Sequence, residues 1–189
     1  MVWLIGYKGM LGSEIAKQLT ENKIDWIGSD RDVDITNPSA LSKFAHNHGT
    51  AAGRTGISVA RGTVPEKITW VINCAAYTAV DKAEEDSELA EKLNAEGPKN
   101  IARITRELGA KLIHISTDYV FDGTGNFPYT EDMLKCPDSV YGRTKAAGED
   151  FVEKEMTQYY ILRTAWLYGL NKKNFVYTMT KAMHSKDEV

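Results

Sequence analysis

The feature that most constrains the fold is a glycine-rich turn directly after an apolar segment at the amino terminus. Residues 2–5 form a short apolar run typical of a buried strand, and Gly6-Tyr7-Lys8-Gly9-Met10-Leu11-Gly12 follows at once. Apolar residues then recur at helical spacing up to Leu19. Strand, glycine turn and helix in this order predict a dinucleotide-binding unit. In such a unit Gly6 turns the chain, Gly9 lets the backbone approach a pyrophosphate, and Gly12 lets the helix pack closely.

Strand-like and helix-like segments alternate along the rest of the chain, which is typical of a parallel sheet covered by helices. We expect further strands at 25–28, 68–73, 111–116 and 159–163, and helices at 38–44, 87–108, 141–156 and 174–184. The helix at 87–108 should be kinked where Gly97-Pro98 interrupts it. The prediction is an α/β fold: a Rossmann-like, doubly wound parallel sheet with helices on both faces, spanning residues 1–169.

One stretch departs from this alternation. Residues 46–67 are rich in Gly, Thr, Ala and Arg, where a short connection is expected, and they predict a loop insert. His46 and His48 lie at its start without a third ligand nearby in the sequence. We therefore predict a surface loop and no metal site.

The second predicted strand leads into residues that bear on the choice of nucleotide. An acidic residue about 20 residues beyond the glycines, here Asp30, usually binds the adenosine ribose and favours NAD. Arg31 beside it and Lys8 in the glycine turn could instead bind the extra phosphate of NADP. The sequence leaves NADPH and NADH open.

Candidate catalytic residues lie further along the chain. Tyr141 and Lys145 are four residues apart, so they share one face of a helix. A nearby ammonium favours the phenolate, and lowering a tyrosine pKa from about 10 to about 7 requires about 4 kcal/mol. Thr117, which follows a predicted strand, adds a hydroxyl. Such a set can exchange a proton with a carbonyl or an alcohol. Singly, each residue is equally compatible with a structural role.

Composition and charge exclude several classes of function and location. The net charge is −3 with no basic run, which argues against nucleic-acid binding. No apolar run approaches membrane-spanning length, and no signal peptide is visible. Cys74 and Cys136 are the two cysteines, and Cys74 lies in an apolar segment. A cytoplasmic protein without disulfides is expected.

The motifs together resemble a known family. They are the glycine turn, the Cys74-Ala75-Ala76-Tyr77-Thr78-Ala79-Val80-Asp81 segment, Asn94-Ala95-Glu96-Gly97-Pro98, Ser116-Thr117-Asp118-Tyr119-Val120-Phe121-Asp122-Gly123 and Tyr141-Gly142-Arg143-Thr144-Lys145. This set resembles the extended short-chain dehydrogenase/reductases, and most closely their dTDP-4-dehydrorhamnose reductase branch. The likeness runs from residue 2 to about 183, with 46–67 unmatched. It implies NAD(P)H-dependent reduction of the 4-keto group of dTDP-4-dehydro-L-rhamnose.

The resemblance implies a role for each matching position. Tyr141 would protonate the keto oxygen, Thr117 would hydrogen-bond it, and Lys145 would hold the nicotinamide ribose. The residues expected at the substrate are Thr117, Asp118, Tyr119, Val120 and Phe121, although Tyr119 and Phe121 are also typical packing aromatics. The residues expected at the cofactor are Gly6, Lys8, Gly9, Met10, Leu11, Gly12, Asp30, Arg31, Asp34, Ile35, Cys74, Ala75, Ala76, Tyr77, Asn94, Tyr141 and Lys145.

Members of this family are longer than this chain. The resemblance therefore implies that the substrate lobe is largely missing, with residues 170–189 as its start. Two other functions remain open. One is a non-catalytic nucleotide-binding regulatory subunit or an inactive fragment. The other is a nucleotide-sugar epimerase or dehydratase. The expected partner is a dTDP-linked keto-deoxysugar, and a homodimer is compatible with the family.

Overall fold

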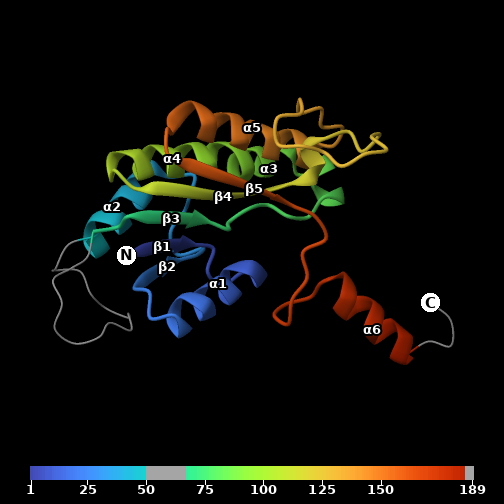
Figure 1. Cartoon of the computed structure of the whole chain (residues 1–189), viewed down its shortest axis with the longest axis horizontal. Coiled ribbons are helices and arrows are strands. Elements are labelled where there is room, and N and C mark those ends of the chain that lie inside the picture. Colours follow the sequence, from blue (N-terminus) through green and yellow to red (C-terminus); the bar gives the residue numbers. More distant parts are fainter. Residues whose placement is uncertain (50–66, 186–189) are drawn as a thin grey trace.

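A five-stranded parallel sheet forms the centre of the molecule (Figure 1). The computed structural model describes residues 1–49 and 67–185. Strands β1 (Val2–Ile5), β2 (Trp26–Ser29), β3 (Trp70–Asn73), β4 (Lys111–Thr117) and β5 (Tyr159–Thr164) lie in the order β2-β1-β3-β4-β5. All neighbouring strands are parallel. This confirms the doubly wound α/β fold, and the chain reverses direction across the sheet between β1 and β3.

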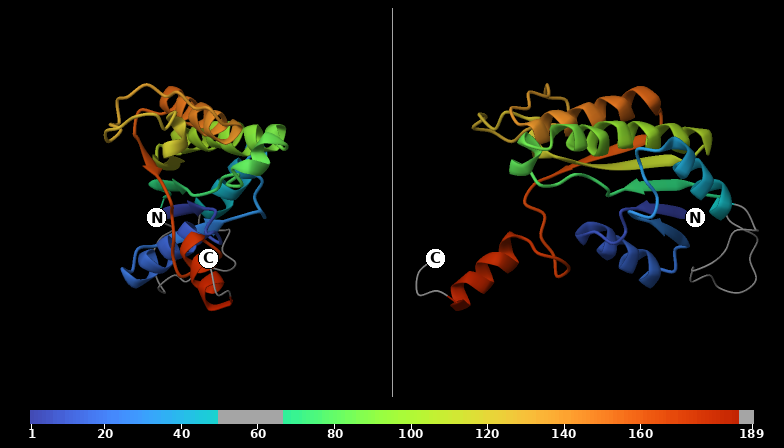
Figure 2. Two further views of the ribbon diagram at one scale, coloured as in Figure 1. Left: turned by 90° about the vertical axis from the view of Figure 1, so that its right-hand side faces the viewer. Right: turned by 180° about the vertical axis from the view of Figure 1, so that it is seen from behind.

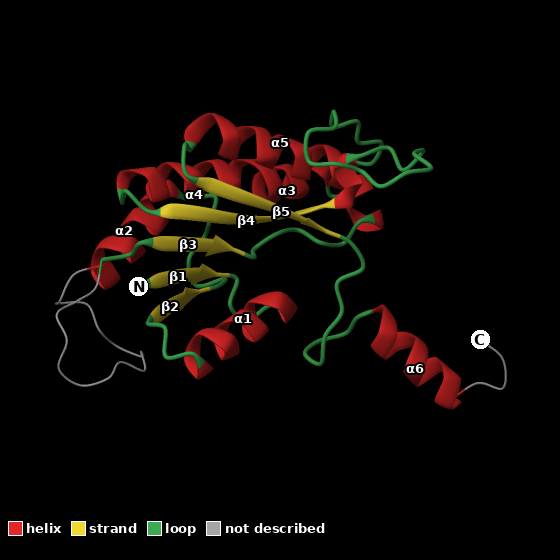
Figure 3. Cartoon of the chain, in the orientation of Figure 1, coloured by secondary structure: helices red, strands yellow, loops and turns green. Residues whose placement is uncertain are grey.

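Helices cover both faces of the sheet. Helix α1 (Met10–Glu21) lies on one face, while α2 (Pro38–Gly49), α4 (Gly97–Glu107) and α5 (Val140–Glu155) lie on the other (Figures 1 and 3). Strand β1 is buried along its whole length because it is central and covered on both sides. Trp3 stacks on Phe44 of α2 with 5.2 Å between ring centroids, and Leu112 and Val152 extend the same core toward α5. This core holds the carboxyl ends of the strands in place.

The long helical region before β4 is continuous but not regular. It runs through α3 (Ser87–Glu91), a π-helical segment at Lys92–Glu96, and α4. The predicted kink at Gly97-Pro98 is replaced by this π-helical turn just before it. Pro98 has no N–H to donate to the Asn94 carbonyl four residues earlier, which accounts for the widened turn. Gly148 of α5 lies against that carbonyl, since a Cβ there would come within 2.1 Å of the Asn94 oxygen.

The second helix is longer than the sequence suggested. We expected it to end near Phe44, but α2 continues to Gly49 and includes His46 and His48. Each imidazole Nδ1 pairs with a backbone carbonyl one turn earlier, that of Ser42 or Phe44. The His48 ring also stacks on Phe44. The start of the predicted loop insert is therefore helical, while residues 50–66 lie outside the described residues. In the described part of the chain, no group of three potential metal-ligating side chains gathers.

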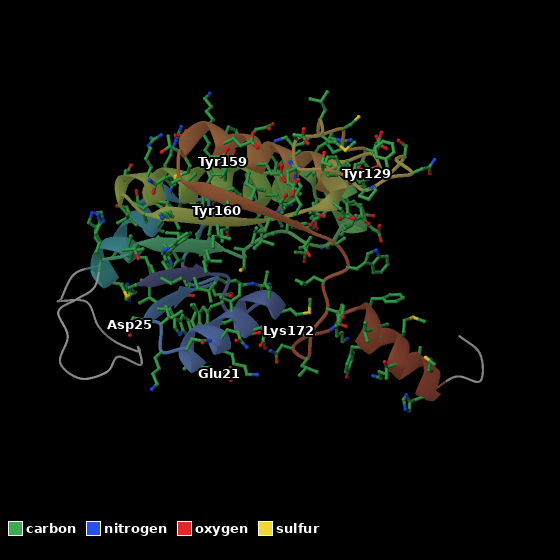
Figure 4. All side chains as sticks on the ribbon, in the orientation of Figure 1. Glu21, Asp25, Tyr129, Tyr159, Tyr160 and Lys172 are labelled. Atoms are coloured by element: carbon green, nitrogen blue, oxygen red, sulfur yellow. The ribbon has the colours of Figure 1, made fainter. Side chains whose placement is uncertain are left out.

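The chain leaves the sheet after β5. Helix α6 (Phe175–Ser185) stands apart from the helical layers on the side of α1 (Figure 2). Large apolar side chains are exposed around it, including Trp166, Leu170 and Phe175. On the sheet itself, Tyr160 of β5 is exposed (Figure 4), and so is Leu162 two residues later on the same face of the strand. Among the described helices, none has the length and apolar character needed to cross a lipid bilayer. The division at residue 169 stays a prediction.

Candidate active site

The glycine turn joins β1 to α1 at the point where the strand order reverses. Gly6 has φ of 77°, in the left-handed region, and its N–H donates to the Ser29 carbonyl at 2.7 Å. A Cβ on Gly6 would lie 2.8 Å from the Ala75 nitrogen, because the segment after β3 passes alongside. A Cβ on Gly12 would lie 2.2 Å from the Gly6 oxygen, which shows how closely α1 packs on the turn.

The first turn of α1 fits an anionic group. The first N–H groups of a helix have no partner within the helix, and they carry partial positive charge. In α1 no side chain caps these groups, and the first turn has no acidic residue. Gly9 precedes the helix, and a Cβ there would meet only the Gly6 oxygen, at 3.2 Å. Bare backbone, a glycine cradle and a strand-order reversal together suit the pyrophosphate of a dinucleotide.

The residues expected around the adenosine lie at the end of β2. The Asp30 carboxylate accepts the Lys8 N–H at 3.1 Å, so it is fixed against the glycine turn. The Arg31 side chain is exposed, and the Asp34 carboxylate accepts the N–H and hydroxyl of Thr36. Ile35 differs from the expectation: its side chain is buried in the core, against Gly97.

The segment after β3 runs beside the glycine turn. The Cys74 N–H donates to the Ile5 carbonyl at 3.0 Å, and Ala75 and Ala76 follow, partly buried. Burial raises the pKa of the Cys74 thiol to about 12, against an opposing effect of Lys145. The Tyr77 hydroxyl donates to Asp86 at 3.0 Å, and both residues are partly buried.

Asn94 holds the segment after β3 in place through hydrogen bonds to the Tyr77 backbone. Its side-chain amide accepts the Tyr77 N–H at 2.8 Å, donates to the Tyr77 carbonyl, and donates to the Thr144 hydroxyl of α5. Asn94 is fully buried, so a direct contact between its side chain and a cofactor is not what the structure shows. The physical reason is the π-helical turn, which places the residue beneath Tyr77 and next to α5. Asn94 positions the segment that the cofactor is expected to follow.

Thr117 and Tyr141 meet at the carboxyl end of β4. A hydrogen bond with the Thr117 side chain lowers the pKa of the Tyr141 phenol, but burial outweighs it, and Asp118 and Tyr119 add to the increase. The Thr117 hydroxyl donates to Asp118 at 3.0 Å and accepts the Tyr119 N–H. The Tyr119 ring lies edge-on to the Tyr141 ring, with centroids 5.6 Å apart. Ser139 caps α5 by accepting the Gly142 N–H, which fixes Tyr141 in the first turn.

Lys145 does not behave as the sequence suggested. We expected its ammonium to lower the Tyr141 pKa, but the net shift of the phenol is upward and Lys145 is not among its causes. Lys145 is 2% exposed and its Nζ donates to the Ile115 carbonyl of β4 at 2.7 Å. The side chain therefore turns toward the sheet and not toward the phenol. Burial lowers its own pKa to about 8, while Glu149 and then Cys74 act in the opposite direction.

The residues expected at the substrate divide into two groups. Asp118 and Tyr119 are exposed beside Tyr141. Val120 and Phe121 are buried, and Phe121 stacks on Tyr129 with centroids 4.4 Å apart, so they support the segment from inside. The placement of Tyr129 in the loop between β4 and α5 is visible in Figure 4. Of the two aromatic residues for which packing was the alternative, Phe121 packs inside, whereas Tyr119 is 45% exposed.

Sequence reasoning missed the buried charges behind Lys145. Glu149 is fully buried one helical turn after Lys145, and Arg163 of β5 binds both of its oxygens at 3.0 and 2.8 Å. The i, i+4 spacing of Lys145 and Glu149 could have indicated that Glu149 lies near Lys145. No local pattern linked Arg163, since its pairing depends on the β4–β5 register.

A doubly wound parallel sheet that carries a glycine cradle at its reversal point defines a dinucleotide-binding protein. The Thr117, Tyr141 and Lys145 positions narrow that to the short-chain dehydrogenase/reductase class. Comparison with known proteins agrees with this class. A family model described as the RmlD substrate binding domain matches residues 1–189, and the chain belongs to this family.

Similar proteins include both curated sequences and solved structures. A probable dTDP-4,6-dihydroxy-2-methyloxan-3-one 4-ketoreductase of Streptomyces antibioticus is 45% identical over 184 residues, 95% of this chain and 56% of that protein. The dTDP-4-dehydrorhamnose reductase of Escherichia coli is 34% identical over 188 residues, 100% of this chain and 58% of that protein. The chain thus spans somewhat more than half the length of these relatives.

Among solved structures, the dTDP-4-dehydrorhamnose reductase of Bacillus anthracis, in complex with NADP, superposes with a TM-score of 0.87 at 35% identity. A dTDP-4-dehydrorhamnose reductase of Clostridium acetobutylicum gives 0.86 at 44% identity. Each comparison covers 100% of this chain and 61% of the other.

Proposed function

We propose that this chain is the cofactor-binding part of an NAD(P)H-dependent reductase that converts dTDP-4-dehydro-L-rhamnose to dTDP-L-rhamnose. The observation that carries the proposal is the uncapped first turn of α1 after the glycine turn, in a fold that also places Tyr141 against the Thr117–Tyr119 segment at the end of β4. The names of the relatives support the substrate, and the NADP complex of the Bacillus anthracis enzyme supports the cofactor.

The proposed chemistry divides the work between the bound nucleotide and the protein. The reduced nicotinamide supplies a hydride to the carbonyl carbon. Tyr141 donates its phenolic proton to the keto oxygen, and Thr117 hydrogen-bonds the same oxygen. Because burial raises the Tyr141 pKa, the phenol is protonated at neutral pH, as a proton donor must be. Lys145 is 2% exposed, and the N–H groups of its Nζ beyond the one that binds Ile115 would donate to the nicotinamide ribose.

The turn and the first strands would hold the nucleotide. The N–H groups at the start of α1 would bind the pyrophosphate, and Asp30, fixed by Lys8, would reach the adenosine ribose. Arg31 is exposed, its backbone N–H donates to the Asp30 carboxylate at 2.9 Å, and its guanidinium would suit a 2′-phosphate. The proposed cofactor is either NADPH or NADH. We also propose a cytoplasmic location, which cell fractionation tests, and a homodimer, which light scattering tests.

The second candidate function is reduction of a related dTDP-linked keto-sugar. The 45% identical relative is named as a 4-ketoreductase of a different dTDP-linked sugar, while the rhamnose-type relative of Escherichia coli is 34% identical. The shared chemistry is reduction of a 4-keto group on a dTDP-linked deoxysugar. Comparing rates with the two keto-sugars separates these candidates.

Calorimetry and a turnover assay test the proposal in sequence. We expect NADPH or NADH to bind this chain. We expect keto-sugar nucleotide to be reduced, with loss of absorbance at 340 nm from the reduced nicotinamide, by a protein in which this chain is joined to a substrate lobe of the family. Tyr141→Phe should bind the nucleotide unchanged and lose roughly 100-fold or more in rate, the usual contribution of a general acid. Tyr160→Phe, at an exposed position of β5, is the matched control and should behave as the wild type.

Three results would count against the proposal in different ways. Absence of binding by both nucleotides contradicts the cofactor assignment. Binding without any reduction favours the non-catalytic nucleotide-binding subunit. An unchanged rate in Tyr141→Phe removes Tyr141 from the proton transfer.

A further inference from the structure

A buried carboxylate lies directly behind the candidate site. Glu149 is 0% exposed and lies four residues after Lys145 on α5, so the two side chains share one face of the helix. Arg163 binds Glu149 through two hydrogen bonds, and Lys135 approaches the same carboxylate with an Nζ–Oε2 distance of 3.5 Å. A buried carboxylate with this many donors is held rigidly.

The cations around Glu149 also reach the segment beside Tyr141. Arg163 donates to the Glu131 carbonyl at 3.2 Å, and its guanidinium lies 5.0 Å from the centroid of the Phe121 ring. Lys135 pairs with Asp150 and Glu153 on the outer side of α5. Glu149 is therefore the point where α5, β5 and the loop from Phe121 to Lys135 are joined.

The other groups facing Lys145 carry little charge of their own. On β4, His114 is fully buried, and its Nδ1 pairs with the Asn73 amide at 3.1 Å. Burial lowers the His114 pKa well below its usual value, so the ring is neutral, and Lys145 adds to this. After β3, the raised pKa of Cys74 keeps the thiol protonated near neutral pH. On α5, Tyr141 carries a raised pKa and is also neutral.

We propose that Glu149 is a positioning residue that keeps the buried Lys145 protonated and turned toward the sheet, and that Arg163 and Lys135 limit how strongly its charge acts. Lys145 has left water, so its ammonium needs a compensating charge. Glu149 supplies that charge from one helical turn away. Because two cations share Glu149, its effect on Lys145 is adjusted by residues on β5 and on the loop.

The arrangement predicts opposite effects for the two partners of one ion pair. Removing the Glu149 charge leaves the buried Lys145 and the partly buried Arg163 without a compensating charge, which makes the Lys145 ammonium less stable. Removing the Arg163 charge leaves Glu149 more available to Lys145, which makes the ammonium more stable. A merely structural role of the pair would not give opposite signs. The consequence for the nicotinamide ribose rests on the function proposed above, whereas the charge arrangement itself does not.

A titration of the Lys145 side chain tests the proposal without nucleotide or substrate. The chain is labelled with ¹³C at lysine Cε, and the Lys145 signal is identified by its loss in Lys145→Arg. We expect Glu149→Gln to lower the titration midpoint by about one to two pH units. A unit charge roughly 6 Å away at an effective dielectric constant of about 20 shifts it by about two units, and the sharing of Glu149 with Arg163 and Lys135 reduces that shift. Arg163→Met should raise the midpoint, and Arg163→Lys should return it toward the wild-type value.

The chain provides a matched control on the same helix. Glu155 of α5 is also bound by two arginines, Arg103 at 2.9 Å and Arg106 at 2.7 Å, but it lies ten residues from Lys145. Glu155→Gln should leave the Lys145 midpoint unchanged. A wild-type midpoint in Glu149→Gln, or a lowered one in Arg163→Met, would overturn the proposal. If Glu149→Gln does not fold, Lys135→Met decides: a raised midpoint supports the proposal, and a lowered or unchanged one rejects it.

Discussion

Gly12→Ala tests how tightly α1 packs on the glycine turn. The added Cβ would lie 2.2 Å from the Gly6 oxygen and 2.8 Å from the Tyr7 Cα. Both are backbone atoms, so no side-chain rotation relieves the overlap and α1 must move away from β1. Overpacking of this kind costs about 1–3 kcal/mol, and the severity of the overlap places Gly12 at the upper end. The better helix propensity of alanine offsets up to about 1 kcal/mol of this cost. The net loss in the free energy of unfolding is therefore about 2 kcal/mol.

That loss has two measurable consequences. In a chain of this size, about 2 kcal/mol corresponds to a fall of about 4–8 °C in the melting temperature, measured by calorimetry. The displaced helix also moves the N–H groups away from the pyrophosphate, so nucleotide affinity should fall by about tenfold or more. Gly9→Ala is the control, because its Cβ would approach the same Gly6 oxygen only to 3.2 Å and should cost less than about 1 kcal/mol. Equal melting temperatures for Gly12→Ala and the wild type would refute the reasoning, as would an equal loss in Gly9→Ala.

Three further predictions concern buried polar groups. Because the Lys145 pKa falls from 10.5 to about 8 on folding, the unfolded chain binds more protons between these values, and the free energy of unfolding should rise by about 3 kcal/mol as the pH increases from 8 to 10.5. Urea unfolding of Lys145→Met should lack that rise. Asn94→Ala removes the hydrogen bonds to Tyr77 and Thr144 and should cost about 2–4 kcal/mol in the same assay; a loss below about 1 kcal/mol would contradict the role of Asn94. Iodoacetamide at pH 8 should modify the exposed Cys136 and spare Cys74, whose pKa is about 12, as read by peptide mass spectrometry.

The sheet was predictable because each of its strands has a recognisable local sequence pattern. Short apolar runs bounded by glycine, asparagine or charged residues occur at each strand, and the glycine turn sets the direction of the first crossover. A parallel sheet buries its strands on both faces, so these runs need no partner to be recognised. The errors at strand ends amount to one or two residues. The doubly wound topology then follows from the right-handed crossover preference.

The departures from prediction arise where one element adjusts to another. The π-helical turn before Gly97 combines a missing N–H at Pro98 with the close approach of Gly148, which is 50 residues away from it in the chain. The extension of α2 to Gly49 depends on carbonyl contacts by His46 and His48 that replace the usual stop signals. Val120 and Phe121 appear in a conspicuous motif, yet they face inward because Tyr129 and Arg163 cover them. The contacts of Gly148 and Arg163 join residues far apart in the sequence, whereas those of His46 and His48 lie within one helical turn.

The Tyr141–Lys145 pair shows why spacing alone is an incomplete guide to electrostatics. A separation of four residues places two side chains on one helical face, but it does not determine which way a long, flexible lysine turns. Here the Ile115 carbonyl and the Glu149 carboxylate both lie toward the sheet, so the ammonium points inward and its charge is directed away from the phenol. The pKa of Tyr141 is then raised mainly by burial, with smaller increases from Asp118 and Tyr119, and it is lowered by Thr117. Reduction of a ketone requires a protonated donor, so a phenol with a raised pKa is in the correct state at neutral pH, and Thr117 is the group that brings its acidity closer to the working range.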